Sequence, residues 1–162
     1  MNIVLIGMPG AGKSTVGVIL AKVLGISFLD TDIVIQQDEK SKLHKIIERF
    51  GIKYFLEVEE RHILGLEVED HVIATGGSVI YSEKSIEHLK ESGILVYLQL
   101  SLKEVEKRLS DITTRGIAME KGSNLEQLYS ERKPLYEKYA DITIDCTGKS
   151  MEEVVGEIVG AL

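Results

Sequence analysis

The chain has 162 residues and a mass of 18.0 kDa, the size of one domain with a single substantial core. Hydrophobic residues make up 44% of it and charged residues 28%, as is typical of a globular protein. The formal net charge of −7 argues against nucleic acid as a partner, because such binding depends on Lys and Arg side chains that neutralise phosphates.

No apolar run approaches the roughly 20 residues that a helix needs to span a bilayer. The N-terminus lacks the basic region of a signal peptide, and its apolar stretch runs straight into a glycine-rich loop. One cysteine, Cys146, excludes an intramolecular disulfide and fits a reducing compartment. We therefore expect a cytoplasmic monomer with a single domain, residues 1–162, and no membrane partner.

The first predicted strand, residues 2–6, leads into a loop that fits G-x-x-x-x-G-K-[ST] at every fixed position. Glycines let consecutive backbone N–H groups surround phosphate oxygens, and the next helix adds the positive end of its dipole. In this pattern Lys13 contacts the β- and γ-phosphates, and the Ser14 hydroxyl binds Mg²⁺. We predict a nucleotide site formed by Gly10, Ala11, Gly12, Lys13, Ser14 and Thr15.

Apolar periodicity predicts helices and strands in alternation along the rest of the chain. The helix after the loop ends at Gly25 and has an apolar stripe of Val16, Ile19, Leu20, Val23 and Leu24. Further helices are expected at 33–49 with a break near 40–41, from Gly51 to about 69, and at 85–92, 102–109, 125–139 and 151–162. In the second of these, the predicted buried residues are Phe55, Val58, Ile63 and Leu64. The other strands are expected at 26–29, 72–75, 94–100 and 141–146.

Five short apolar strands that alternate with helices imply parallel pairing through right-handed crossovers, and therefore a three-layer α/β domain. Ligands of such domains bind where the strands end. The side chains and glycines that suggest chemistry follow the strands in this way: Asp30 and Asp32, Gly76 and Gly77, Arg108 and Arg115, and Arg132.

Phosphoryl transfer needs a phosphate cradle, a metal, a group that orients the attacking oxygen, and cations on the transferred group. Asp30 and Asp32, at i and i+2 beyond a strand, are expected to point to the same side of an extended chain. One can then hold Mg²⁺ through water while the other accepts a hydroxyl proton. The alternative is a turn or a helix N-cap without catalytic function.

The arginines have two possible roles. Arg108 and Arg115 flank the start of a glycine-containing segment, residues 110–124, which we expect to be a mobile lid that excludes water from the γ-phosphate. The alternative for both is a solvated surface position. For Arg132 the alternative is a surface salt bridge with a neighbouring glutamate.

Histidine and cysteine are assigned structural roles. The histidines show no metal-ligand spacing: His44, His62, His71 and His88. Cys146 is expected to be a buried strand residue.

Segments in order over nearly the whole chain resemble the shikimate kinase family. They are the phosphate loop, 28–32, 73–77, 96–98, the Arg108 and Arg115 pair, and 131–136. The resemblance implies the P-loop fold of nucleoside-monophosphate kinases, with a five-stranded parallel sheet in the order 2-3-1-4-5 flanked by helices. It also implies transfer of the γ-phosphate of ATP to the 3-hydroxyl of shikimate with Mg²⁺, an acceptor-binding helical region at about 33–69, and a lid at about 110–124.

The resemblance further implies roles for individual residues. On the donor side, Lys13 and Ser14 keep the roles given above, Asp30 lies near Mg²⁺, Arg108 stacks on adenine and Arg115 is the catalytic arginine of the lid.

On the acceptor side, Asp32 binds the acceptor hydroxyl and acts as the base. Gly76 and Gly77 offer backbone contacts to the acceptor, and Arg132 grips its carboxylate.

Three positions depart from the family pattern. Leu56 stands where the family has an arginine that helps to clamp the carboxylate, Ser78 replaces the third glycine of a turn, and Gly116 replaces the proline after the lid arginine. Lys53 or Arg61 could supply the missing charge from other places.

Three functions other than that of a shikimate kinase are compatible with a phosphate loop. A paralogue with a different hydroxylated acceptor is distinguished by Leu56. A GTP switch would need an early D-x-x-G and an N-K-x-D, whereas the sequence has D-x-x-G only at 145–148 and no N-K-x-D. A catalytically idle nucleotide-binding module is disfavoured by Lys13, Asp32 and Arg115.

Overall fold

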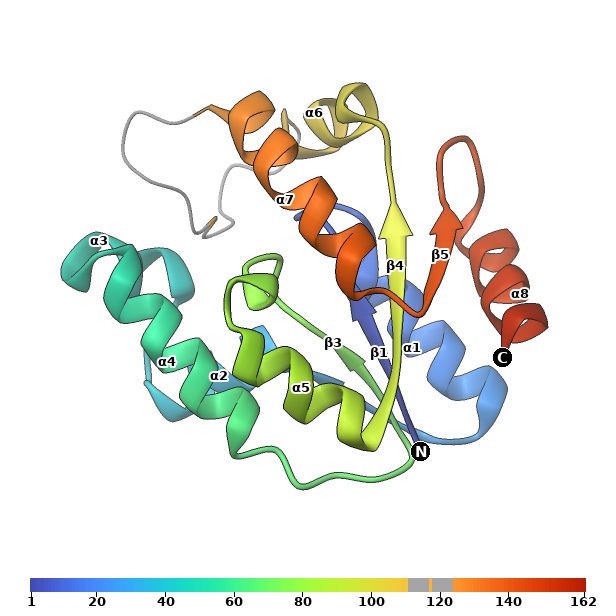
Figure 1. Cartoon of the computed structure of the whole chain (residues 1–162), viewed down its shortest axis with the longest axis horizontal. Coiled ribbons are helices and arrows are strands. Elements are labelled where there is room, and N and C mark those ends of the chain that lie inside the picture. The colour runs from blue at the N-terminus through green and yellow to red at the C-terminus, as the bar shows by residue number, and fades with distance from the viewer. Residues whose placement is uncertain (111–116, 118–123) are drawn as a thin grey trace.

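The structure, a computed structural model, describes residues 1–110, 117 and 124–162 (Figure 1). Its strands are β1 (Asn2–Ile6), β2 (Ser27–Asp30), β3 (His71–Ala74), β4 (Gly93–Gln99) and β5 (Ile142–Asp145). Its helices are α1 (Lys13–Leu24), α2 (Thr31–Asp38), α3 (Leu43–Phe50), α4 (Ile52–Leu64), α5 (Glu83–Ser92), α6 (Leu102–Ser110), α7 (Leu125–Tyr139) and α8 (Met151–Ala161), with a short 3₁₀ turn, η1 (Val79–Tyr81).

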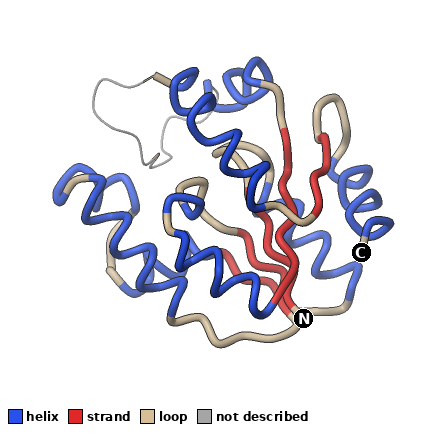
Figure 2. Tube along the Cα trace, viewed as in Figure 1, coloured by secondary structure: helices blue, strands red, loops and turns tan. Residues whose placement is uncertain are grey.

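The five strands form one parallel sheet in the order β2-β3-β1-β4-β5, as predicted (Figure 2). The central strand, β1, is buried along its whole length, with Val4 opposite Ile73 on one side and Leu95 on the other. Because all strands run the same way, their carboxyl ends share one edge of the sheet. The loops that leave this edge carry the phosphate loop and the residues after β2 and β3.

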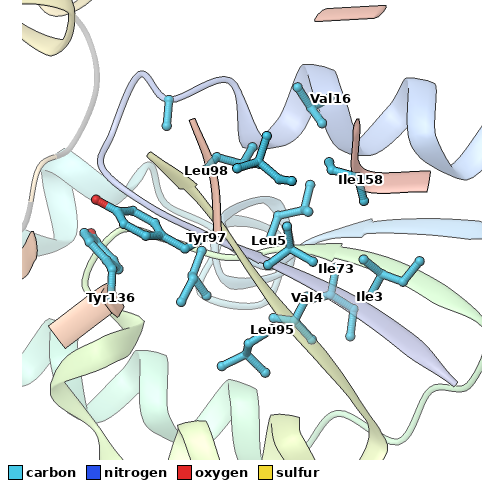
Figure 3. Packing of buried hydrophobic residues seen from close by; sticks show 14 of the residues in the cluster. Ile3, Val4, Leu5, Val16, Ile73, Leu95, Tyr97, Leu98, Tyr136 and Ile158 are labelled. Atoms are coloured by element: carbon cyan, nitrogen blue, oxygen red, sulfur yellow. The ribbon is translucent and has the colours of Figure 1, made fainter. Parts of the chain in front are cut away.

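Helices cover both faces of the sheet, which confirms the three-layer α/β prediction (Figure 1). In Figure 3, Leu98 lies on the same side of the sheet as Val16 of α1 and Ile158 of α8, whereas Leu95 lies on the opposite side. The opposite face is covered by α5 and α7. The period-2 alternation of the strands therefore divides one continuous core between the two layers of helices.

A second, smaller core holds α2, α3 and α4 together beside the sheet (Figure 1). Its buried members are Ile35, Leu43, Ile46, Phe55 and Val58. This helical unit occupies most of the region that the sequence resemblance assigned to acceptor binding.

Several predicted details are wrong. α2 begins at Thr31 directly after β2, and α4 ends at Leu64 rather than near 69. Val23 and Leu64 are predicted to be buried but are exposed. The buried face of α1 includes Val16 and Leu20, and that of α4 includes Ile63. The predicted helix at 125–139 is confirmed as α7, which continues through Pro134. None of the described helices is both long and apolar enough to cross a membrane.

Candidate active site

A cavity of about 270 Å³ lies at the carboxyl edge of the sheet. It is lined by the phosphate loop, the β2–α2 junction, the first residues of α3, the turn after β3, and one residue of α7. Predicted site residues from four distant segments meet there: Gly10, Gly12, Lys13, Ser14, Thr15, Asp30, Asp32, Gly76, Gly77 and Arg132.

The phosphate loop is folded around the Lys13 ammonium. Gly12 precedes α1 with a φ of 92°, a left-handed conformation that glycine adopts without strain. Lys13 Nζ donates hydrogen bonds to the carbonyl oxygens of Gly7 at 2.7 Å and Met8 at 2.9 Å, and the residue is buried. The positive charge is therefore held inside the loop, where nucleotide phosphates bind in this motif.

Asp30 connects the phosphate loop to α2. Its Oδ2 accepts a hydrogen bond from Ser14 Oγ at 2.6 Å, and its Oδ1 caps α2 by accepting from the backbone N–H groups of Asp32 and Ile33. The Asp30 side chain is therefore the N-cap of α2 and, through its other oxygen, also contacts the residue predicted to bind Mg²⁺. A hydroxyl and a carboxylate side by side fit a Mg²⁺ ion that takes its remaining oxygens from phosphates and water.

Asp32 lines the cavity, but its backbone conformation differs from the predicted one. It lies in the first turn of α2 and not on extended chain, because the Asp30 cap starts the helix at Thr31. Its carboxylate lies against the turn after β3, where a Cβ added to Gly76 would be 2.8 Å from Asp32 Oδ1 and 2.7 Å from Glu59 Oε2. Gly76 therefore allows two carboxylates to approach the same stretch of backbone.

Glu59 is a member of this group that sequence reasoning missed. It is only 3% exposed, its Oε1 accepts a hydrogen bond from Ser78 Oγ at 2.8 Å, and its Oε2 has no partner among the described residues. Burial raises its pKa to about 7, with the nearby Asp32 charge adding to the rise and the Ser78 bond opposing it. The sequence spacing could have indicated its burial, because Glu59 lies four residues from both Phe55 and Ile63 on the buried face of α4.

Arg132 is fully enclosed, which rules out the surface salt bridge considered for it. Its Nε donates to Tyr81 Oη at 3.2 Å, and its Cζ lies 5.3 Å from the Tyr81 ring centroid. A Cβ on Gly77 would be 2.7 Å from Arg132 Nη1, and the Gly77 carbonyl accepts from Tyr136 Oη at 2.6 Å. The turn after β3 and α7 thus fix the guanidinium at the cavity wall.

The other predicted donor-side residues lie outside this cavity or outside the described chain. Ala11 is buried within the phosphate loop, and Arg108 Nη1 donates to the Gly10 carbonyl oxygen at 3.2 Å. Arg115 and most of the expected lid, 110–124, are not among the described residues.

Leu56 packs against the core of α2, α3 and α4 rather than lining the cavity. Neither candidate for the missing charge lines it either: Lys53 is exposed, and Arg61 pairs with Glu39 at 2.9 Å.

Three of the four histidines contact backbone carbonyl oxygens through a ring nitrogen: His62, His71 and His88. His44 is half-buried and lines the cavity, so its structural role stays a prediction. Cys146 is buried one residue after β5, and burial raises the pKa of its thiol to about 11.

The sequence is similar to one family profile and to proteins that carry the same family name. Residues 9–162 match the family profile described as shikimate kinase. A shikimate kinase from Thermodesulfovibrio yellowstonii is 37% identical over 161 residues, which are 98% of this chain and 92% of that protein.

Solved structures agree with the sequence comparison. Shikimate kinase from Aquifex aeolicus superposes with a TM-score of 0.82 at 33% identity, covering 99% of this chain and 95% of that one. Shikimate kinase from Acinetobacter baumannii, in complex with shikimate, gives a TM-score of 0.80 at 30% identity, covering 99% and 91%.

Proposed function

The chain belongs to the shikimate kinase family, and from this premise we propose that it transfers the γ-phosphate of ATP to the 3-hydroxyl of shikimate. The observation that carries the proposal is the single cavity shared by the phosphate loop, Asp32 and Arg132. A donor phosphate, a proton acceptor and a carboxylate-binding cation are the three things that phosphorylation of a hydroxy acid requires.

On the donor side, Lys13 exchanges its contacts with the Gly7 and Met8 carbonyl oxygens for phosphate oxygens of ATP. Its ammonium then stabilises the charge that develops on the γ-phosphate. Ser14 and Asp30 are the residues that would hold Mg²⁺, which when bound neutralises charge on the β- and γ-phosphates.

On the acceptor side, the Asp32 carboxylate accepts the proton of the reacting hydroxyl as that oxygen bonds to the γ-phosphorus. The bond between the γ-phosphorus and the bridging oxygen of ATP breaks in the same transfer, and ADP leaves with that oxygen. The Gly76 and Gly77 backbone lines the same space, and Arg132 pairs with the acceptor carboxylate. Tyr81 holds Arg132 in place, so that the hydroxyl is presented to Asp32 with little freedom.

We further propose that the protein acts in the cytoplasm as a single-domain monomer that does not bind nucleic acid. The net charge of −7 and the single buried cysteine support these points. Closure of a lid carrying Arg115 remains a prediction from sequence.

The second candidate function is phosphorylation of a different hydroxylated acceptor. Leu56 favours it, because leucine cannot pair a carboxylate as the family's arginine does.

A panel of acceptors separates the two functions. ADP release is measured with shikimate, quinate, gluconate and glycerate at matched concentrations, with wild-type protein and the Asp32→Asn variant. Shikimate should give the highest kcat/KM, and Asp32→Asn should lower kcat about 10²- to 10⁴-fold, the range for loss of a general base. Preference for another acceptor would reject shikimate while leaving the kinase assignment in place.

A further inference from the structure

Two basic side chains in the cavity have no role in the mechanism above. Lys42 is the residue before α3 and His44 lies in the first turn of that helix, and both line the cavity. Neither side chain makes a hydrogen bond or ion pair with any described residue. Arg61, on the neighbouring α4, is by contrast already paired with Glu39.

The position of these side chains completes an asymmetric charge pattern. The carboxylates of the cavity, Asp30 and Asp32, both come from the β2–α2 junction. The basic side chains outside the phosphate loop come from the start of α3 and from α7, and the apolar side chains of Leu43 and Phe55 line the same cavity. A ligand that fits this pattern has an apolar ring face, a hydroxyl for Asp32, and an anionic group for the cations.

We propose that Lys42 and His44 bind the acceptor carboxylate together with Arg132, and so make the start of α3 the element that selects an anionic acceptor. The proposal rests on the proposed function, because it places the carboxylate of the same substrate. Lys42 contributes a flexible charge, and the imidazole of His44 offers at least one N–H donor. The amino-terminal end of α3 adds a favourable field for an anion.

The proposal also accounts for Leu56. Its side chain stabilises the core of α2, α3 and α4 together with Ile46 and Val58. In this proposal the start of α3, and not α4, supplies the second positive charge of the cavity. The acceptor carboxylate is then bound by Lys42 and His44 as well as by Arg132.

Steady-state kinetics of four variants test the proposal. Lys42→Met and His44→Phe remove the charge or the N–H with little change in side-chain size, and Lys42→Arg restores the charge. Lys45→Gln is the matched control, since Lys45 is exposed on the same helix and does not line the cavity. We expect the KM for shikimate to rise about tenfold in Lys42→Met, the low end of the range for loss of a hydrogen bond to a charged group, and about threefold in His44→Phe, within the range for an ordinary hydrogen bond. The KM for ATP and kcat should stay within twofold, and Lys42→Arg and Lys45→Gln should match wild type.

The methyl ester of shikimate separates charge recognition from general damage to the pocket. Wild type and Lys42→Met should have the same KM for the ester, because the ester lacks the charge that Lys42 recognises. An equal rise in KM for both acceptors would contradict carboxylate recognition by Lys42. A KM for shikimate that is unchanged in both Lys42→Met and His44→Phe would overturn the proposal while the shikimate kinase activity stands. If wild type neither binds shikimate in calorimetry nor phosphorylates it, the proposed function fails and this assignment fails with it.

Discussion

At the scale of single residues, Glu59 makes stability depend on pH. Its pKa is about 7 in the folded protein against 4.5 for the free side chain, because burial disfavours its charge. Between these values the unfolded chain has released this proton and the folded protein retains it. The free energy of unfolding therefore falls as pH rises from 4.5 to 7, by about 3 kcal/mol from this group.

Glu59→Gln tests this dependence. Urea unfolding at pH 5 and pH 8 gives the change in the free energy of unfolding between the two pH values for each protein. We expect wild type to lose about 3 kcal/mol more than the variant over this interval. Contributions from all other groups are common to the two proteins and cancel in the comparison. Equal changes in the two proteins would show that Glu59 is ionised throughout.

Tyr81 is a positioning residue for Arg132. Tyr81→Phe keeps the ring under the guanidinium and removes the hydroxyl that Nε contacts at 3.2 Å. We expect the KM for shikimate to rise about threefold to tenfold, with kcat and the KM for ATP within twofold, and stability to fall by about 1 kcal/mol. Tyr54→Phe is the control, since Tyr54 lies on the outer surface of α4 and its hydroxyl makes no hydrogen bond with the described residues. A change in kcat alone would argue against positioning.

At the scale of elements, the turn after β3 has room for a side chain at Gly76 only if two neighbouring carboxylates move. A Cβ there would be within 2.8 Å of carboxylate oxygens from both α2 and α4. Gly76→Ala should therefore lower the free energy of unfolding by about 1–3 kcal/mol and impair turnover with shikimate. Unchanged stability in urea would mean that the carboxylates of Asp32 and Glu59 turn away at little cost.

Gly156 in α8 is the opposite case. A Cβ at this position would meet nothing within 4 Å, and the residue lies inside a regular helix. Gly156→Ala should raise the free energy of unfolding by about 0.5–1 kcal/mol, because alanine loses less conformational freedom on folding. Urea unfolding of both alanine variants distinguishes the crowded glycine from the free one, and a destabilised Gly156→Ala would contradict the packing of α8.

The elements that could be predicted from sequence are those specified by local patterns. β1 and β4 are apolar runs bounded by glycine or polar residues, and the phosphate loop is a fixed motif. Local patterns did not predict the start of α2. It depends on the Asp30 side chain, which caps the helix and also contacts Ser14. Contacts between distant segments decide such boundaries.

At the scale of the whole molecule, the fold class predicted the edge at which the site residues meet. It did not predict which side chains fill the acceptor half. Glu59 resembles a solvated glutamate in sequence, and His44 resembles an ordinary helix residue. Their roles depend on the packing of α3 and α4 beside the sheet, which periodicity alone does not determine.

One measurement tests the central claim that this cavity joins ATP and shikimate. Wild-type protein is incubated with ATP, Mg²⁺ and shikimate, and the phosphorus products are followed by ³¹P NMR. We predict a new phosphate monoester signal that grows in step with ADP, and its near absence with Asp32→Asn. ADP formed with inorganic phosphate alone, or no ADP at all, would contradict the assignment.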